Sequence, residues 1–279
     1  MAHTRVTELS ESDILFLVKT VDPALLSKMD AIKYDRDIIE SMMEQQTRKL
    51  FQRIMGMDEE TITTTITPRF LFEILLRTAQ RDLEGQAYTV ERTATQRIPV
   101  FDGREVVSFL NNKAVLKYLA DMLTSFTRIE SFTLRVRVRK GIWRKIRFND
   151  MDIDNLLRFC QSLDEEHRFS SYKRIADLCL FVLGMFPEYI TMDYRYPSSS
   201  DARPRLFGRL RRSIEDYEEE GRRFYKLAEE HRDATLLDMV EVLHQLHNKF
   251  NLAKKPLNFI SERYLQFRRE NLFSLLPSN

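Results

Sequence analysis

The stretch that decides the fold is YKRIADLCLFVLGMF, residues 172–186, because it is apolar on almost every side of a helix. A helix that is apolar all round lies inside a protein, whereas a surface helix keeps one polar face. Gly184 and Pro187 mark its end, since both residue types are common at helix C-termini. We therefore expect this helix to be the central buried element, with the other helices packed around it.

The composition favours helices joined by polar turns. Of the 279 residues, 43% are hydrophobic and 31% are charged, which is ordinary for a globular protein and atypical of a disordered chain. Only seven residues are glycine, well below the usual share of about 7%. Phosphate loops and tightly turned β-architectures need more, because glycine adopts positive φ most readily. The predicted fold class is mainly α, a multi-helix globular core with a small antiparallel β-hairpin.

Capping residues indicate where helices begin. Thr67-Pro68 combines an N-cap residue with a proline at the first helical position, where its missing N–H costs nothing. Asp102, with Glu105 three residues later, fits a capping box. The apolar pattern that follows predicts one long helix that ends near Leu123.

The linker YPSSSDARP, residues 196–204, interrupts the helical pattern with two prolines and three serines. It either separates domains or forms a mobile loop within one. The predicted organisation is a helical core over 1–195 with an inserted hairpin at 132–148, then C-terminal helices over 205–279 that pack on the same core.

The inserted hairpin is FTLRVRVRKGIWRKIRF, residues 132–148. A two-residue turn would pair apolar with charged residues, whereas a three-residue loop at 139–141 aligns the apolar residues on one face. That register also gives Gly141 the left-handed position that such loops favour. The predicted apolar pairs are Val138–Ile142, Leu134–Ile146 and Phe132–Phe148, with Arg144 opposite Val136 as the exception.

The other face of this hairpin is densely basic. Between residues 128 and 147 there are eight basic residues and one acidic residue, a net charge of +7 in a chain whose net charge is only +2. Basic ribbons with an aromatic residue are typical of surfaces that bind phosphates or other anions. The candidate polyanion-binding residues are Arg135, Arg137, Arg139, Lys140, Trp143, Lys145 and Arg147.

Two other interpretations of the basic face stay open. Arginines on a sheet edge can protect it against aggregation. Alternatively, the basic side chains pair with acidic residues elsewhere in the fold, for which the acidic stretch 215–220 is the candidate.

The chain offers weak candidates for metal binding and none for catalysis. Glu241, His244 and His247 follow one another at intervals of three on a predicted helix, which is half of a helical di-metal signature. The alternative is that both histidines flank an apolar stripe, so we assign no metal. Cys160 and Cys179 match no zinc spacing and are expected to be buried thiols in a reducing cytoplasm. Because phosphate-loop, dinucleotide and hydrolase motifs are missing from the sequence, we expect no cofactor and lean against an enzyme.

The leading functional prediction is a cytoplasmic binding or regulatory protein whose basic hairpin contacts nucleic acid or another polyanion, such as an acidic protein. The longest uncharged run, 178–187, is half a membrane span, so no membrane partner is expected. The alternative is a self-associating helical scaffold with no nucleic-acid role. Its sequence support is a set of methionines that suit a partner groove: Met42, Met43, Met55 and Met57.

The order of elements from Pro68 to Phe148 resembles that of a winged-helix module, in which helices are followed by a β-hairpin. A strand at Tyr88–Thr93 would add a third strand to such a sheet. The sequence departs from the pattern because the helix over 106–123 is long for a recognition helix and no short helix precedes it.

Overall fold

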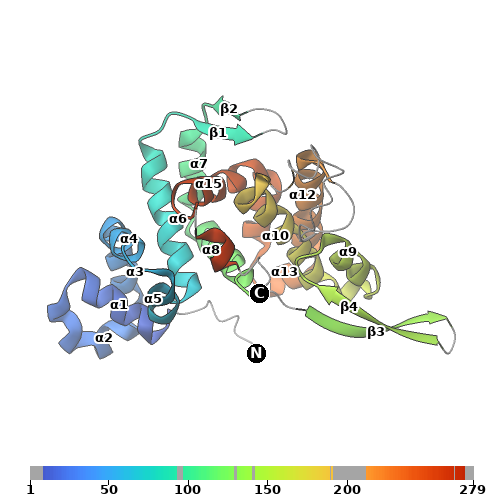
Figure 1. The fold of residues 1–279 in the computed structure, drawn as a ribbon, viewed down its shortest axis with the longest axis horizontal. Coiled ribbons are helices and arrows are strands. Elements are labelled where there is room, and N and C mark those ends of the chain that lie inside the picture. Colours follow the sequence, from blue (N-terminus) through green and yellow to red (C-terminus); the bar gives the residue numbers. More distant parts are fainter. Residues whose placement is uncertain are drawn as a thin grey trace.

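The computed structural model describes residues 9–92, 97–128, 131–139, 142–188, 190, 212–266 and 268–273. These residues form helices and two separate two-stranded antiparallel sheets (Figure 1). The predicted mainly α fold with a small β component is confirmed.

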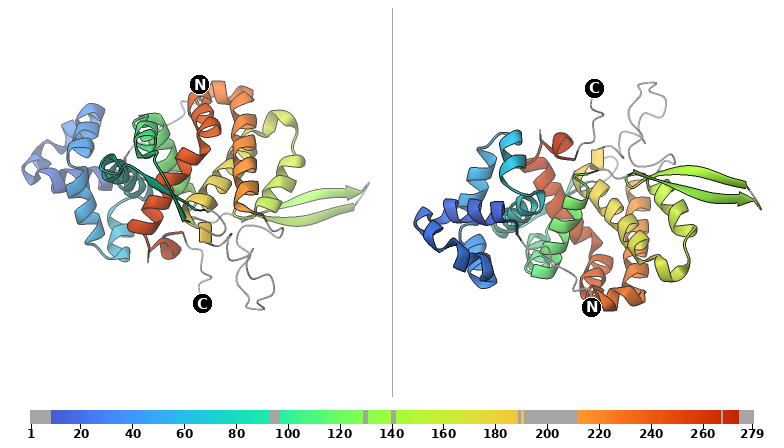
Figure 2. Two further views of the ribbon diagram at one scale, coloured as in Figure 1. Left: turned by 90° about the horizontal axis from the view of Figure 1, so that it is seen from above. Right: turned by 90° about the horizontal axis from the view of Figure 1, so that it is seen from below.

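The N-terminal helices are short and gather at one end of the molecule (Figures 1 and 2). They are α1 (Glu11–Val21), the 3₁₀ turn η1 (Pro23–Lys28), α2 (Met29–Tyr34), α3 (Arg36–Gln45), α4 (Thr47–Met55) and α5 (Glu59–Thr65).

The rest of the described chain builds the body and the hairpins. Its elements are α6 (Pro68–Glu84), β1 (Thr89–Arg92), β2 (Arg97–Val100), α7 (Gly103–Leu110), α8 (Lys113–Ser125), β3 (Ser131–Arg139), β4 (Ile142–Asn149), α9 (Ile153–Gln161), the 3₁₀ turn η2 (Glu165–His167), α10 (Phe169–Met185), α12 (Ile214–Glu230), α13 (Arg232–Leu236), α14 (Val240–Asn248), α15 (Phe250–Arg263) and α16 (Arg269–Leu272).

Helix α10 is the central element, as its apolar sequence predicts. Every residue from Ile175 to Phe186 is buried, and α12 and α15 pack against it. The packing is close enough to require glycine at two points. A Cβ atom on Gly184 would lie 2.6 Å from Leu257 Cβ of α15, and one on Gly221 of α12 would lie 2.4 Å from Phe250 Cε2.

One buried carboxylate joins three helices of this core. Asp177 of α10 accepts hydrogen bonds from the hydroxyl groups of Tyr118 in α8, at 2.6 Å, and Tyr225 in α12, at 2.8 Å. Lys173, one turn earlier, donates to its other oxygen at 2.6 Å. A buried carboxylate is tolerated when it is paired and fully hydrogen-bonded. Burial raises the pKa of both tyrosines well above the ordinary value, so they stay neutral donors.

The predicted start of α6 is confirmed, and its cap is shared with α1. The Thr67 hydroxyl accepts a hydrogen bond from Phe70 N, and Pro68 takes the first helical position. Asp13, fully buried in α1, accepts hydrogen bonds from Thr67 N at 2.7 Å and Thr67 Oγ1 at 2.8 Å. The same carboxylate accepts from Ser10 N at 3.0 Å and closes the capping box of α1.

The predicted helix from Asp102 to Leu123 is wrong in two respects. The capping box does not form, because the Asp102 carboxylate instead pairs with Lys255 of α15 and accepts a hydrogen bond from the Thr89 hydroxyl. The helix is also divided in two. Asn112 ends the pattern and caps α8 by accepting hydrogen bonds from the next amides, a role that asparagine often takes.

The strand predicted at Tyr88–Thr93 forms as β1, but it does not add a third strand to the β3–β4 hairpin. Strand β1 pairs with β2, with Val90 opposite Pro99, and both belong to a sheet separate from β3 and β4. The division of the long helix supplies the short helix that the winged-helix pattern lacked. The shared sheet of that pattern is not formed, however, and most of α8 is buried in the body, so it is not an open recognition helix.

The buried hydrophobic residues from Ile14 to Phe273, apart from Leu83 and Val106, belong to one cluster. The linker at 196–204 lies outside the described residues, so a domain boundary there stays a prediction.

Candidate functional site

The basic hairpin projects from the helical body as a two-stranded ribbon, at the end of the molecule opposite the N-terminal helices (Figures 1 and 2). Strands β3 and β4 pair with each other, and α9 lies against β4 near its base. The local sequence accounts for the pairing, because apolar residues alternate with basic ones in both strands.

The predicted register is confirmed along most of the ladder. Phe132 lies opposite Phe148, and Leu134 lies opposite Ile146. On the alternate positions the Cα partners are Thr133–Arg147, Arg135–Lys145 and Arg137–Trp143.

The register is wrong next to the turn, where Ile142 lies opposite Arg139 rather than Val138. A register shift between Arg137 and Arg139 accounts for the difference. Such a bulge adds one residue to one strand and so shifts the pairing by one residue between its two sides. Of the candidate polyanion-binding residues, Lys140 lies outside the described residues and the other six lie in the two strands.

The base of the ribbon is held by a residue that the sequence did not single out, Arg174 of α10. Its Nη1 donates to Ser125 Oγ, at the end of α8, at 2.7 Å. Its Nη2 forms an ion pair with Asp150, which directly follows β4. The guanidinium also lies 3.7 Å from the ring centroid of Phe126. Ser125 and Phe126 lie six and five residues before β3, and Asp150 directly follows β4.

Two carboxylates of the acidic stretch 215–220 on α12 pair with basic side chains that lie outside the hairpin. Glu218 pairs with Lys254 of α15. Glu220 lies 3.4 Å from Arg212 Nε, and Arg212 also donates to Asp154 of α9 at 2.7 Å. Burial raises the pKa of Glu220 in spite of this arginine. The predicted partner of the basic hairpin therefore has two of its carboxylates engaged by other residues.

The predicted metal candidates do not come together. His244 Nδ1 lies 2.8 Å from Glu229 Oε1, and His247 Nδ1 lies 3.6 Å from the other oxygen of the same carboxylate. Glu241 instead accepts a hydrogen bond from Gln245. Within the described ranges, no group of three or more His, Cys, Asp and Glu side chains is arranged to hold a metal ion. Glu229, on a neighbouring helix, could not be found from spacing within one helix.

A buried ion network crosses α3, α6 and α8. Glu73, only 2% exposed, is bracketed by Arg69 at 2.9 Å and Arg77 at 2.7 Å. Arg77 also binds Glu40 at 2.8 Å. Burial favours the neutral form of Glu40, but hydrogen bonds and charges from Arg77 and two lysines outweigh it and lower its pKa to about 2.

Cavities of about 410 and 450 Å³ flank this network. Their size suits small ligands. Arg69 and Arg77 pair with carboxylates of the protein, namely Glu73, Asp121 and Glu40. Charge-compensated arginines of this kind fix the packing of helices rather than attract an anion.

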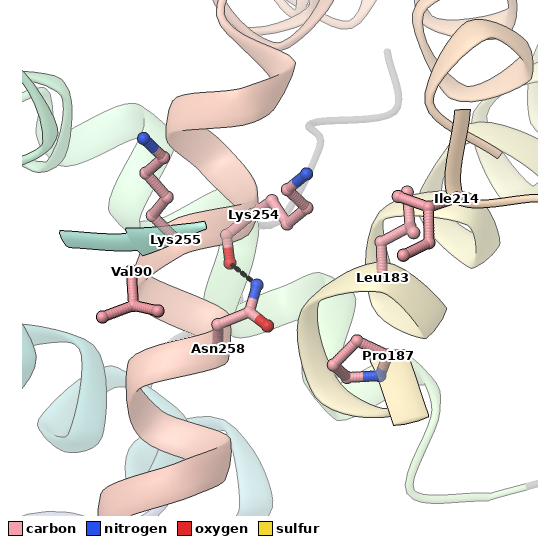
Figure 3. Close-up of a pocket in the computed structure, with 7 residues that line it drawn as sticks. All are labelled: Val90, Leu183, Pro187, Ile214, Lys254, Lys255 and Asn258. Atoms are coloured by element: carbon pink, nitrogen blue, oxygen red, sulfur yellow. Dashed lines mark hydrogen bonds between the residues drawn. The ribbon is translucent and has the colours of Figure 1, made fainter. Parts of the chain in front are cut away.

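The cavity drawn in Figure 3 is too small for a substrate. It lies between α10, α15 and the start of α12 and has a volume of about 10 Å³, the space of a single water molecule. Asn258 donates to the carbonyl of Lys254 at 2.9 Å, while its buried Oδ1 makes no hydrogen bond.

No helix in the described part of the chain is both long and apolar enough to cross a membrane. Comparison of the chain with protein-family models, with curated proteins and with solved structures finds no match.

Proposed function

We propose that this protein binds nucleic acid through the β3–β4 ribbon and acts as a binding or regulatory protein of the cytoplasm. The observation that carries the proposal is that the most basic segment of the chain projects from the body as a paired ribbon (Figure 1). Two free, buried cysteines are consistent with a reducing compartment.

The dimensions of the ribbon favour duplex DNA. Strand β3 has nine residues, so it extends about 30 Å at roughly 3.4 Å per residue. The major groove of B-DNA is about 12 Å wide and admits a two-stranded ribbon. The major groove of an RNA duplex is deep and narrow and does not admit one. Arg135, Arg137, Lys145 and Arg147 would contact phosphates, which sets position and affinity without reading the sequence.

The test is a titration of labelled duplex DNA at several salt concentrations. The variant Arg135→Gln/Arg137→Gln/Lys145→Gln removes three cations from the ribbon. The logarithm of affinity falls as the logarithm of salt concentration rises, and each phosphate contact contributes about 0.9 to the steepness of that fall. We therefore expect the variant's slope to be shallower by up to about 3.

A matched control removes the same charge from the opposite end of the molecule. Lys19, Lys28 and Arg48 are exposed residues of the N-terminal helices, and their replacement by glutamine should leave the slope unchanged. Equal binding by wild type and the ribbon variant at every salt concentration would refute the proposal. Binding of polyglutamate but not of DNA would move the assignment to an acidic protein.

The second candidate function is self-association, and a different observation favours it. The predicted methionine groove is not formed, because Met42 and Met43 are buried and Met55 and Met57 pack against the core. Three apolar side chains are instead exposed on one face of the β1–β2 hairpin, namely Tyr88, Val90 and Phe101, and Phe101 is 81% exposed. The rings of Tyr88 and Phe101 lie 6.1 Å apart, and Ile98 is exposed on the opposite face.

Salt separates the two candidates. Apolar association between two copies does not weaken as salt rises, whereas binding to a polyanion does. Sedimentation at low and high salt, for wild type and Phe101→Ser, measures the fraction of the protein that self-associates. A monomer under all conditions would exclude self-association.

A further inference from the structure

Arg174 links the segment that precedes the ribbon to the residue that follows it. One guanidinium donates to Ser125, six residues before β3, and pairs with Asp150, which directly follows β4. Its stacking partner Phe126 is fully buried and stacks in turn on Phe181 of α10, with centroids 4.3 Å apart. These contacts therefore connect Arg174 with the buried core of the fold.

We infer that Arg174 is a positioning residue, which sets the direction in which the ribbon leaves the body and so presents its basic residues in a fixed orientation. The inference rests on the proposed function, because an oriented ribbon matters only if it enters a ligand. Orientation before binding lowers the entropy lost on binding and so raises affinity without any added contact.

Arginine is suited to this role in a way that lysine is not. Its planar guanidinium can donate in two directions and stack on a ring at the same time. Ser125, Asp150 and Phe126 use these three capacities at once. A lysine at position 174 keeps the charge but has no planar group. It can retain the ion pair with Asp150, but it loses the stacking on Phe126 and the simultaneous donation to Ser125 and Asp150.

The chain provides its own reporter of ribbon motion. Trp143 is the only tryptophan, and it lies in β4. Time-resolved fluorescence anisotropy of Trp143 therefore follows the ribbon without a label. In the wild type we expect the anisotropy to decay with the tumbling of the whole protein. In Arg174→Lys we expect an additional, faster decay on the nanosecond scale.

DNA binding gives the second measurement. Arg174→Lys should bind duplex DNA about two- to tenfold more weakly, the factor that corresponds to ordering one more flexible group on binding. The salt slope should stay that of the wild type, because the phosphate-contacting residues are still present. Ser125→Ala, which removes a single hydrogen bond, should show a smaller change in the same direction and guards against a variant that fails to fold.

Arg168→Lys is the matched control. Arg168 precedes α10, donates to the Leu163 carbonyl and pairs with Glu165, and these partners lie outside the ribbon. Its replacement should change neither the Trp143 decay nor DNA affinity.

The outcomes separate this inference from the proposed function. A wild type that binds no duplex refutes the function, while the Trp143 decay still tests the attachment. Wild-type decay and wild-type affinity in Arg174→Lys would overturn the inference alone. Weaker binding with a reduced salt slope would also overturn it, since Arg174 would then be contacting phosphate itself.

Discussion

Replacing Gly184 by alanine should destabilise the protein although alanine is the better helix former. The new Cβ would lie 2.6 Å from Leu257 Cβ and 2.7 Å from Leu257 Cδ1, well inside contact distance. Because a Cβ atom is fixed to its backbone, the clash can be relieved only if α10 and α15 move apart. Overpacking of a core costs about 1–3 kcal/mol, and the helix propensity of alanine returns at most about 1 kcal/mol. We expect a net loss of about 1–2 kcal/mol in the free energy of unfolding.

Two other glycines make the measurement specific. A Cβ on Gly221 would meet the end of the Phe250 ring, which a smaller side chain can vacate, so Phe250→Leu should suppress the loss caused by Gly221→Ala. A Cβ on Gly85 would have its nearest neighbour at 3.9 Å, so Gly85→Ala should be neutral or slightly stabilising. The assay is urea unfolding followed by circular dichroism. If Gly184→Ala is as stable as Gly85→Ala, the close approach of α10 and α15 is not the constraint that we describe.

Two further predictions concern buried carboxylates. Asp13→Ala should lower the free energy of unfolding by about 2–3 kcal/mol, because it leaves the amides that the carboxylate satisfies without a partner. The control Asp22→Ala removes an exposed cap and should lower the free energy of unfolding by about 1 kcal/mol. Equal losses for the two variants in urea unfolding would contradict the shared cap. The pKa of Glu40 is lowered from 4.5 to about 2 in the folded protein, so its ionised form stabilises the fold above pH 4.5 and this stability is lost as pH falls toward 2. The stability difference between wild type and Glu40→Gln should therefore shrink by up to about 2 kcal/mol between pH 7 and pH 3, and a difference that does not change with pH would show that the carboxylate charge is not what stabilises the network.

The sequence predicts those features of the fold that depend on neighbours along the chain. The burial of residues 175–186 follows from a helix that is apolar on almost every side, and the cap at Thr67 follows from a two-residue signal. The ribbon register follows from alternation over eight residues in each strand. Its one error lies at the bulge near Arg139, where no alternation is left to constrain the pairing.

Features that depend on distant partners could not be predicted. The capping box at Asp102 failed because Lys255, far along the chain, takes the carboxylate. Arg174 lies in an apolar helix and carries no local sign that its partners lie on either side of the ribbon in the chain. The division of the long helix at Asn112 could have been predicted, because an asparagine inside an apolar helical pattern is itself a signal for a helix start.

The attachment of the ribbon has a consequence for how this protein can vary. Since Ser125 and Asp150 reach the same guanidinium, the two points where the chain leaves and rejoins the body are adjacent. An insertion whose ends are adjacent can be lengthened, shortened or replaced by a short turn without moving the helices on either side. The helical body, with Arg174 bridging Ser125 and Asp150, could therefore carry a ribbon of another length or charge.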